Sequence, residues 1–339
     1  MLVPALCMTL VANGLGSAAE RITFTTDNAE APISIGAYLS VPAGDGPFPA
    51  AILMHGCTGL ERESASMPWR GLNDHARFLN DHGYVTLIVD SHGSRGIRVP
   101  AAWHDSCRDG KGFRERVGDA YGAAAYLESL PVVAKGRIAL IGLSQGGSTV
   151  LNSLAVAEQY RRKPRLSAGV AIYPDCIFGG HPQAFYAPIL ILAPELDDIT
   201  PLPECKTVVK LAEAGKEKDE ATVVPELQVL VGTHHAFDLP LTRQEVTPIG
   251  TVAPNSSALA ITRKSMLAFF DRFTKAPVSG GPGTDSAIVK KSERGIKLKA
   301  GVSSQQAYEL AVKHCAEHRK RSAIVSSPPA ASAFQFVCY

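Results

Sequence analysis

The stretch IALIGLSQGGSTVLNSLAV, residues 138–156, places one serine between glycines where an aliphatic run changes into a helical pattern. The first part has the composition of a buried strand, and the second has the spacing of a helix. Gly142, Ser144 and Gly146 fit the pattern G-x-S-x-G. A nucleophilic serine needs this strand–turn–helix setting, because larger flanking side chains would collide with neighbouring backbone. The five residues alone leave open whether Ser144 is a nucleophile or a turn residue.

Strand-like runs alternate with helical patterns around this stretch, from Arg21 to about Thr274. The later runs, with helical patterns between most of them, include AAILMHG, YVTLIVD, AGVAIYP, PILILAP and LQVLVGT. Short strand–helix–strand connections predict an α/β fold, with a mostly parallel sheet covered by helices on both faces. The early runs RITFTT and ISIGAYLSV predict an antiparallel hairpin at one edge.

An acid and a histidine follow later strands in the order Ser, Asp, His, which a catalytic triad uses in this architecture. Asp197 follows the run PILILAP, and His235 follows LQVLVGT. A serine hydroxyl is a poor nucleophile, so an imidazole must accept its proton and a carboxylate must orient the imidazole. We therefore predict a triad of Ser144, Asp197 and His235. The adjacent Asp198 and His234 remain alternatives for the acid and the base.

Two backbone N–H groups are expected to hold the oxyanion that forms during attack. The first belongs to Gln145, the residue after the nucleophile, and the second to the loop after the third strand. That loop reads HGCTGL, residues 55–60, and we assign the second donor to Cys57, with Thr58 as the alternative. His55 is interpreted as part of the turn that brings the loop over the site.

Taken together, these motifs resemble the dienelactone hydrolase family of α/β-hydrolases, and within it the exported members with a serine nucleophile. The matching stretches span about residues 50–238 and comprise HGCTGL, VDSHGSRG followed by Cys107, IGLSQGG, YPDC, LDDITPLPEC and HHAFD. The resemblance implies the α/β-hydrolase fold and the triad Ser144, Asp197 and His235. Family members that cleave dienelactones use a cysteine nucleophile, so the serine in this chain does not imply a dienelactone substrate.

Two further side chains are candidates for substrate contact. Arg95 could hold a substrate carboxylate with its planar guanidinium, and the alternative is an ion pair that braces its loop. Trp69 is expected to pack over the mouth of the pocket or in the core. The scattered histidines and the absence of C-x-x-C do not suggest a metal site, and His314 and His318 are interpreted as solvated helix-end residues. We expect neither a metal nor an organic cofactor.

The charge balance argues against polyanionic partners. The chain has 34 lysines and arginines against 32 acidic residues, with a formal net charge of +2 and no basic stripe. Nucleic acid and anionic membrane surfaces are therefore not expected partners. A small ester-type molecule is the expected substrate.

The N-terminal segment MLVPALCMTLVANGLGSAAE has an apolar run followed by small residues at the spacing of an export-cleavage site. We predict a signal peptide over residues 1–19, which is too short to span a bilayer, with a buried first helix as the alternative. Its removal would take Cys7 and leave an even set of cysteines, which could pair in the periplasm or outside the cell. We predict sequential disulfides, with free thiols as the alternative: Cys57–Cys107, Cys176–Cys205 and Cys315–Cys338.

A segment rich in Gly, Pro and Ser, KAPVSGGPGTDS, follows the last long helical pattern and indicates a domain boundary. We predict a main domain over residues 20–274, a linker over 275–286 and a small α+β module over 287–339. A module of about fifty residues has a marginal core, so a disulfide would stabilise it most. We expect this module to contact a component of the cell envelope.

The sequence as a whole predicts a serine hydrolase that cleaves a carboxylic ester, lactone or thioester through an acyl-enzyme. A peptidase or acyltransferase with the same triad is the alternative among enzymes. A non-catalytic envelope-binding protein is the alternative from another class.

Overall fold

A computed structural model describes six stretches of the main part of the chain and four short strands near its C-terminus. The stretches are residues 19–28, 30–60, 70–97, 113–156, 162–177, 184–275, 288–292, 295–298, 322–326 and 335–338, the last four as backbone strands, with residue 29 as the break between the first two. The chain divides into two compact units, Met1–Lys275 and Ala276–Tyr339.

An eight-stranded sheet forms the first unit, in the order β1-β2-β4-β3-β5-β6-β7-β8. Strands β1 and β2 pair antiparallel with each other, and β2 is antiparallel to β4. All pairs from β4 to β8 are parallel. The predicted α/β class, with an antiparallel early hairpin, is therefore confirmed. The strands are β1 (Glu20–Thr25), β2 (Ser34–Ser40), β3 (Phe48–Met54), β4 (Val85–Asp90), β5 (Val133–Leu143), β6 (Ala168–Ile172), β7 (Ile189–Pro194) and β8 (Glu226–Leu230).

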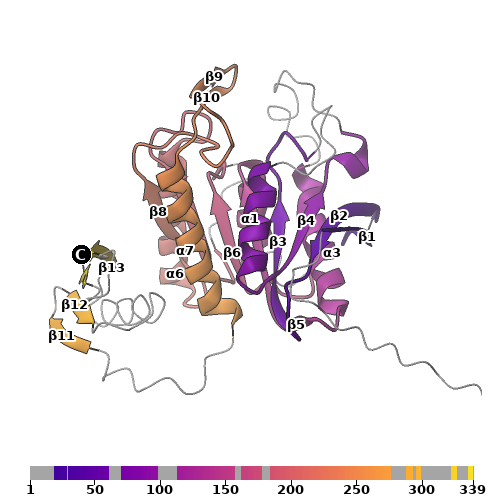
Figure 1. The fold of residues 1–339 in the computed structure, drawn as a ribbon, viewed down its shortest axis with the longest axis horizontal. Helices are drawn as coiled ribbons and strands as arrows, with labels where there is room; N and C mark the ends of the chain where they lie inside the picture. Colours follow the sequence, from indigo (N-terminus) through magenta and orange to yellow (C-terminus); the bar gives the residue numbers. More distant parts are fainter. Residues whose placement is uncertain are drawn as a thin grey trace, which may run out of the picture. The chain divides into compact units, whose positions relative to one another are not determined.

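Helices cover both faces of this sheet. One face carries α1 (Arg70–Asp81) and α7 (Ser256–Thr274), which contact each other and lie in front of the strands in Figure 1. The other face carries α3 (Phe113–Ser129), α4 (Gln145–Ser153) and α6 (Leu202–Lys218). This layering matches the prediction of a sheet buried on both sides.

The hydrophobic core has two layers, one on each face of the sheet. In β3, Ile52 packs with the layer under α3, α4 and α6, whereas Leu53 packs with the layer under α1 and α7. Successive strand side chains point to opposite faces, so a strand covered on both sides must be apolar throughout. This is why the parallel strands read as continuous apolar runs in the sequence.

The carboxyl ends of the parallel strands carry the sequence motifs. Strands β5, β7 and β8 end directly before the segments that contain Ser144, Asp197 and His235. Because these strands run parallel within one stretch of the sheet, their ends lie along a single edge. The hairpin of β9 (Glu245–Thr247) and β10 (Gly250–Val252) projects beyond this edge (Figure 1), and a β-bridge joins His235 to Val252.

The second unit contains a four-stranded antiparallel sheet in the order β11-β12-β14-β13. Three of its strands lie in predicted strand segments: β12 (Gly295–Leu298), β13 (Ser322–Ser326) and β14 (Gln335–Cys338). The fourth, β11 (Ile288–Ser292), was not predicted, because its polar sequence IVKKS carries no clear apolar alternation. The helix predicted over residues 303–317 lies outside the described residues, as does Cys315.

Disulfides are present in the first unit. Cys176, after β6, is bonded to Cys205 in the first turns of α6, which confirms that predicted pair. Cys57 is also disulfide-bonded, and its predicted partner, Cys107, lies outside the described residues. Most of the predicted signal peptide, residues 1–18, likewise lies outside them. Within the described part of the chain, no helix is long and apolar enough to cross a membrane.

The Cys176–Cys205 bond should contribute measurably to stability. It links residues 29 positions apart, and closing such a loop destabilises the unfolded chain by about 3.5 kcal/mol through lost entropy. We expect the double variant Cys176→Ala/Cys205→Ala to lose about that much free energy of unfolding, measured by urea denaturation. Alanine introduces no new polar group at these two buried positions. An unchanged urea midpoint in the double variant would contradict the prediction.

Candidate active site

Ser144 occupies a strained turn between β5 and α4. Its backbone has φ 53° and ψ −119°, a conformation that residues other than glycine rarely adopt. A Cβ at Gly142 would collide with the carbonyl of Gly146, and a Cβ at Gly146 would collide with the carbonyl of Met54. Both glycines of the G-x-S-x-G pattern are therefore required by backbone packing, and the turn leaves Ser144 partly exposed.

The side chains of Ser144, His235 and Asp197 meet in a hydrogen-bonded chain. His235 Nε2 lies 3.1 Å from Ser144 Oγ, and His235 Nδ1 lies 2.8 Å from Asp197 Oδ2. The histidine and the aspartate are buried. In this geometry the imidazole can accept the serine proton while the carboxylate holds its Nδ1–H.

Asp197 is fixed by its own loop. Its Oδ1 accepts hydrogen bonds from the backbone N–H groups of Ile199 (3.0 Å) and Thr200 (2.9 Å). Its Oδ2 accepts one from Thr200 Oγ1 at 2.9 Å, beside the bond to His235. These donors hold the carboxylate in place and aim Oδ2 at the imidazole. Thr200 was not predicted from the sequence, where its only signal is its position three residues after the aspartate.

The alternatives for the acid and the base point elsewhere. The carboxylate of Asp198 accepts hydrogen bonds from the backbone N–H (2.8 Å) and Oγ1 (2.9 Å) of Thr251 in β10. Partial burial acts to raise the pKa of Asp198, but these hydrogen bonds outweigh it and the pKa is lowered. Asp198 thus anchors the hairpin, and the imidazole that reaches Ser144 is that of His235, not His234.

The two backbone segments predicted to form an oxyanion hole flank the serine. Gln145 is the first residue of α4, where helical N–H groups carry partial positive charge. The loop after β3 passes beside the nucleophile, since a Cβ at Gly56 would lie 3.5 Å from the Cβ of Ser144. Cys57 follows directly in that loop. The donor roles of Gln145 and Cys57 remain predictions.

Arg95 forms the loop-bracing ion pair that was the alternative to a substrate contact. Its guanidinium makes a two-pronged contact with Asp119, with N–O distances of 2.8 Å and 2.7 Å, and also donates to the carbonyl of Ser91 at 2.8 Å. Asp119 is fully buried, so this pair ties the turn after β4 to α3. The other candidate, Trp69, lies outside the described residues.

A buried polar cluster beneath the serine was missed by the sequence analysis. Arg116, within α3, is fully buried and donates to Gln145 Oε1 at 2.8 Å and to the carbonyl of His55. The rings of His55 and His92 lie 4.6 Å apart beside it. Only the packing of α3 on the sheet distinguishes Arg116 from the other charged residues of that helix, so a single sequence gives no signal for it.

Both histidines of this cluster are held neutral. Burial, followed by the charges of Arg116 and Arg95, lowers the pKa of His92 to about 3. Burial and the charge of Arg116 also lower the pKa of His55 well below its usual value. The cluster therefore carries its positive charge on the two arginines and not on the imidazoles.

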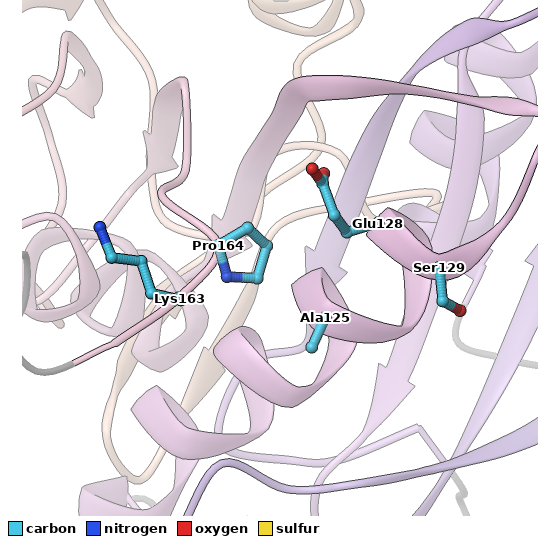
Figure 2. Close-up of a pocket in the computed structure, with 5 residues that line it drawn as sticks. All are labelled: Ala125, Glu128, Ser129, Lys163 and Pro164. Carbon is cyan, nitrogen blue, oxygen red and sulfur yellow. The ribbon is translucent and has the colours of Figure 1, made fainter.

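A surface hollow of about 430 Å³ lies apart from these residues. Figure 2 shows it between the C-terminal end of α3 and the segment before β6, lined by Ala125, Glu128, Ser129, Lys163 and Pro164. The C-terminal end of α3 leads into the start of β5, at the edge of the sheet opposite Ser144. The hollow therefore cannot serve the serine. Among the described residues, no group of three or more His, Cys, Asp or Glu side chains could hold a metal ion.

The mostly parallel sheet and the strand–turn–helix geometry at Ser144 are those of the α/β-hydrolase fold. Comparisons with known proteins agree. Residues 71–162, which include Ser144, match the model of the prolyl oligopeptidase family. No curated protein matches the sequence.

Solved structures with the same fold include dienelactone hydrolase-like proteins and a peptidase. A dienelactone hydrolase-like promiscuous phosphotriesterase from metagenomic libraries is 21% identical, covers 76% of this chain and 99% of its own, and gives a TM-score of 0.58. A protein described as a dienelactone hydrolase, from Klebsiella pneumoniae, is 19% identical, covers 76% and 100%, and gives 0.57. Dipeptidyl peptidase 4 of Porphyromonas gingivalis is 16% identical, covers 75% and 35%, and gives 0.53. At these identities the likeness is one of fold.

The neutral histidines should make stability depend on pH. His92 binds a proton in the unfolded chain below about pH 6.5 but not in the folded protein, where its pKa is about 3. Protonation of His92 in the unfolded chain therefore lowers the free energy of unfolding as the pH drops below about 6.5. At pH 5 this loss is about 2 kcal/mol. The variant His92→Phe keeps an aromatic ring beside His55 but has no imidazole to protonate. Between pH 7.5 and pH 5 we expect the free energy of unfolding to fall by about 2 kcal/mol less in this variant than in the parent. Urea denaturation at both pH values measures it, and an equal loss in parent and variant would contradict it.

Proposed function

We propose that this protein is a serine hydrolase that cleaves a carboxylic ester, lactone or thioester through an acyl-enzyme. The observation that carries the proposal is the chain of contacts from Ser144 Oγ to His235 Nε2 (3.1 Å) and from His235 Nδ1 to Asp197 Oδ2 (2.8 Å). The strained turn at Ser144 and the α/β-hydrolase fold support it. No other residue is needed to activate the hydroxyl.

In the proposed acylation step, Ser144 Oγ attacks the substrate carbonyl and its proton passes to His235 Nε2. Asp197 stabilises the imidazolium that forms, through the bond to Nδ1. The N–H groups of Gln145 and Cys57 hold the negative oxygen of the tetrahedral intermediate. His235 then protonates the leaving alcohol or thiol as the bond from the carbonyl carbon to the leaving group breaks, and the acyl group remains on Ser144.

In the proposed deacylation step, a water molecule attacks the acyl-enzyme while His235 takes its proton. The second tetrahedral intermediate collapses, His235 returns the proton to Ser144 Oγ, and the carboxylic acid leaves. An acyltransferase would differ only in the acceptor that replaces water. The same residues therefore serve both reactions.

Ester cleavage is favoured over peptide cleavage by the extent of the structural matches. The dienelactone hydrolase-like structures are matched over 99% and 100% of their length, whereas the dipeptidyl peptidase is matched over 35%. The second candidate, peptide hydrolysis, is favoured by the match of residues 71–162 to the prolyl oligopeptidase family. Turnover of p-nitrophenyl esters beside peptide p-nitroanilides would separate the two.

We further propose that the protein is exported, to the periplasm or the medium. The predicted signal peptide and the Cys176–Cys205 bond support this, because disulfides persist in oxidising compartments. The role proposed for the C-terminal unit is contact with a component of the cell envelope. The non-catalytic binding protein remains the alternative if Ser144 is not reactive.

The decisive experiment is labelling of the purified protein with a fluorophosphonate serine probe. We expect the parent to be labelled and Ser144→Ala to be unlabelled, because the phosphonyl group bonds to the activated hydroxyl. A folded parent that does not label would overturn the proposed function.

The neighbouring aspartates provide a matched pair of variants. We expect Asp197→Asn to lower kcat on a reactive ester by about 10⁴-fold, because the amide favours the wrong imidazole tautomer. Asp198→Asn should change kcat by less than about ten-fold, since its carboxylate faces Thr251 and not His235. Equal losses in the two variants would contradict the assignment of Asp197 as the orienting acid.

A further inference from the structure

The guanidinium of Arg116 is buried without exposure to solvent, although burying a cation is costly. Its neighbour Asp119, which attracts it, makes its two-pronged contact with Arg95. The polar contacts of Arg116 itself go to a side-chain amide and a backbone carbonyl. Such a placement favours a role that needs the charge at this position.

These two contacts reach both segments that flank the serine. Arg116 Nη1 donates to Gln145 Oε1 at 2.8 Å, on the residue that follows the nucleophile. Arg116 Nη2 donates to the carbonyl of His55, two residues before Cys57. The rigid planar fork of a guanidinium holds two acceptors on separate segments in one fixed geometry, whereas the donors of an ammonium rotate around a single nitrogen and fix no such geometry.

The two segments already touch through their backbones. A Cβ on Gly146, the next residue of α4, would collide with the carbonyls of both Met54 and His55. A small shift of either segment would therefore change the distance between the Gln145 and Cys57 N–H groups. Arg116 donates a hydrogen bond to each of the two segments and so can fix their relative position.

Arg116 is also charged at neutral pH. Burial lowers its pKa to about 9, with Asp119 opposing the shift and Arg95 adding to it, so the group stays charged at neutral pH. The adjacent His55 and His92 are neutral. A fixed positive charge in a dry environment stabilises negative charge that develops nearby.

We propose that Arg116 is a positioning residue for the oxyanion hole: its guanidinium holds the N–H of Gln145 and the loop of Cys57 in register around Ser144. This inference rests on the proposed function. Arg116 does not touch the reacting atoms, and it acts through the two donors that it fixes. Its removal should therefore weaken binding of the transition state more than binding of the substrate.

The test compares Arg116→Gln and Arg116→Lys with the full-length parent. On p-nitrophenyl acetate we expect Arg116→Gln to lower kcat by about 100-fold with little change in KM, as expected for a disturbed oxyanion hole. Arg116→Lys keeps the charge but not the rigid two-pronged geometry, so we expect it to recover part of the loss. The lysine variant also keeps the proposal testable if the glutamine variant does not fold.

A trifluoromethyl ketone provides the readout that a merely structural role would not move. Its adduct with Ser144 carries an oxyanion in the hole, so its affinity should fall in each variant by the same factor as kcat/KM. Tyr84→Phe is the matched control, because it removes buried hydrogen bonds to Asp271 (2.7 Å) and Thr274 (2.9 Å) at the opposite edge of the sheet. It should lower Tm while leaving kcat and ketone affinity unchanged.

The outcomes separate the two proposals. If both Arg116 variants lower Tm but keep the kcat and ketone affinity of the parent, Arg116 is only structural and the inference is overturned while the serine hydrolase stands. If the parent itself reacts with neither the fluorophosphonate nor the ester, the proposed function fails first and the inference fails with it.

Discussion

The close contact between Gly146 and the carbonyls of Met54 and His55 fixes the two backbone segments that flank Ser144. It allows the start of α4 to pack directly against the loop after β3, so no side chain can intervene. The chain must then turn sharply after β5, and Ser144 takes up the strain in a positive φ of 53°. The partly exposed Ser144, the glycine spacing and the proximity of the two flanking segments are all consistent with this one close approach.

Around that fixed point, residues far apart in the sequence hold the histidine in place. The Tyr173 ring lies 4.7 Å from the His235 ring, and its hydroxyl donates to Asp238 at 2.6 Å. Asp238 also lies 3.1 Å from the Nε2 of His75 in α1. Burial, together with the charge of Asp238, raises the pKa of Tyr173, so the phenol stays protonated and keeps donating. The imidazole is thus oriented by packing as well as by Asp197.

Sequence reasoning succeeded where local rules decide the structure. Continuous apolar runs are required in parallel strands covered on both faces, so they predicted the sheet, and the positions of Asp197 and His235 after such runs predicted where they would meet. Tyr173 and Arg116 were missed, because their contacts join segments that are far apart in the sequence. Thr200 was missed although its contact with Asp197 is local, because a threonine three residues after an aspartate is not distinctive in a single sequence. For Arg95 the sequence left two interpretations open, and the structure shows the ion pair with Asp119 that one of them expected.

The buried arginines near Ser144 show a conflict between stability and the proposed function. Arg95 is matched by the carboxylate of Asp119, whereas Arg116 contacts a neutral amide and a carbonyl. A core optimised for stability alone would replace such a group with an apolar side chain. His55 and His92 limit the cost by staying neutral beside the cations, but they make the protein sensitive to acid. A positive charge that is expensive to bury thus lies against the two segments that flank the proposed nucleophile, as expected if it serves to position them.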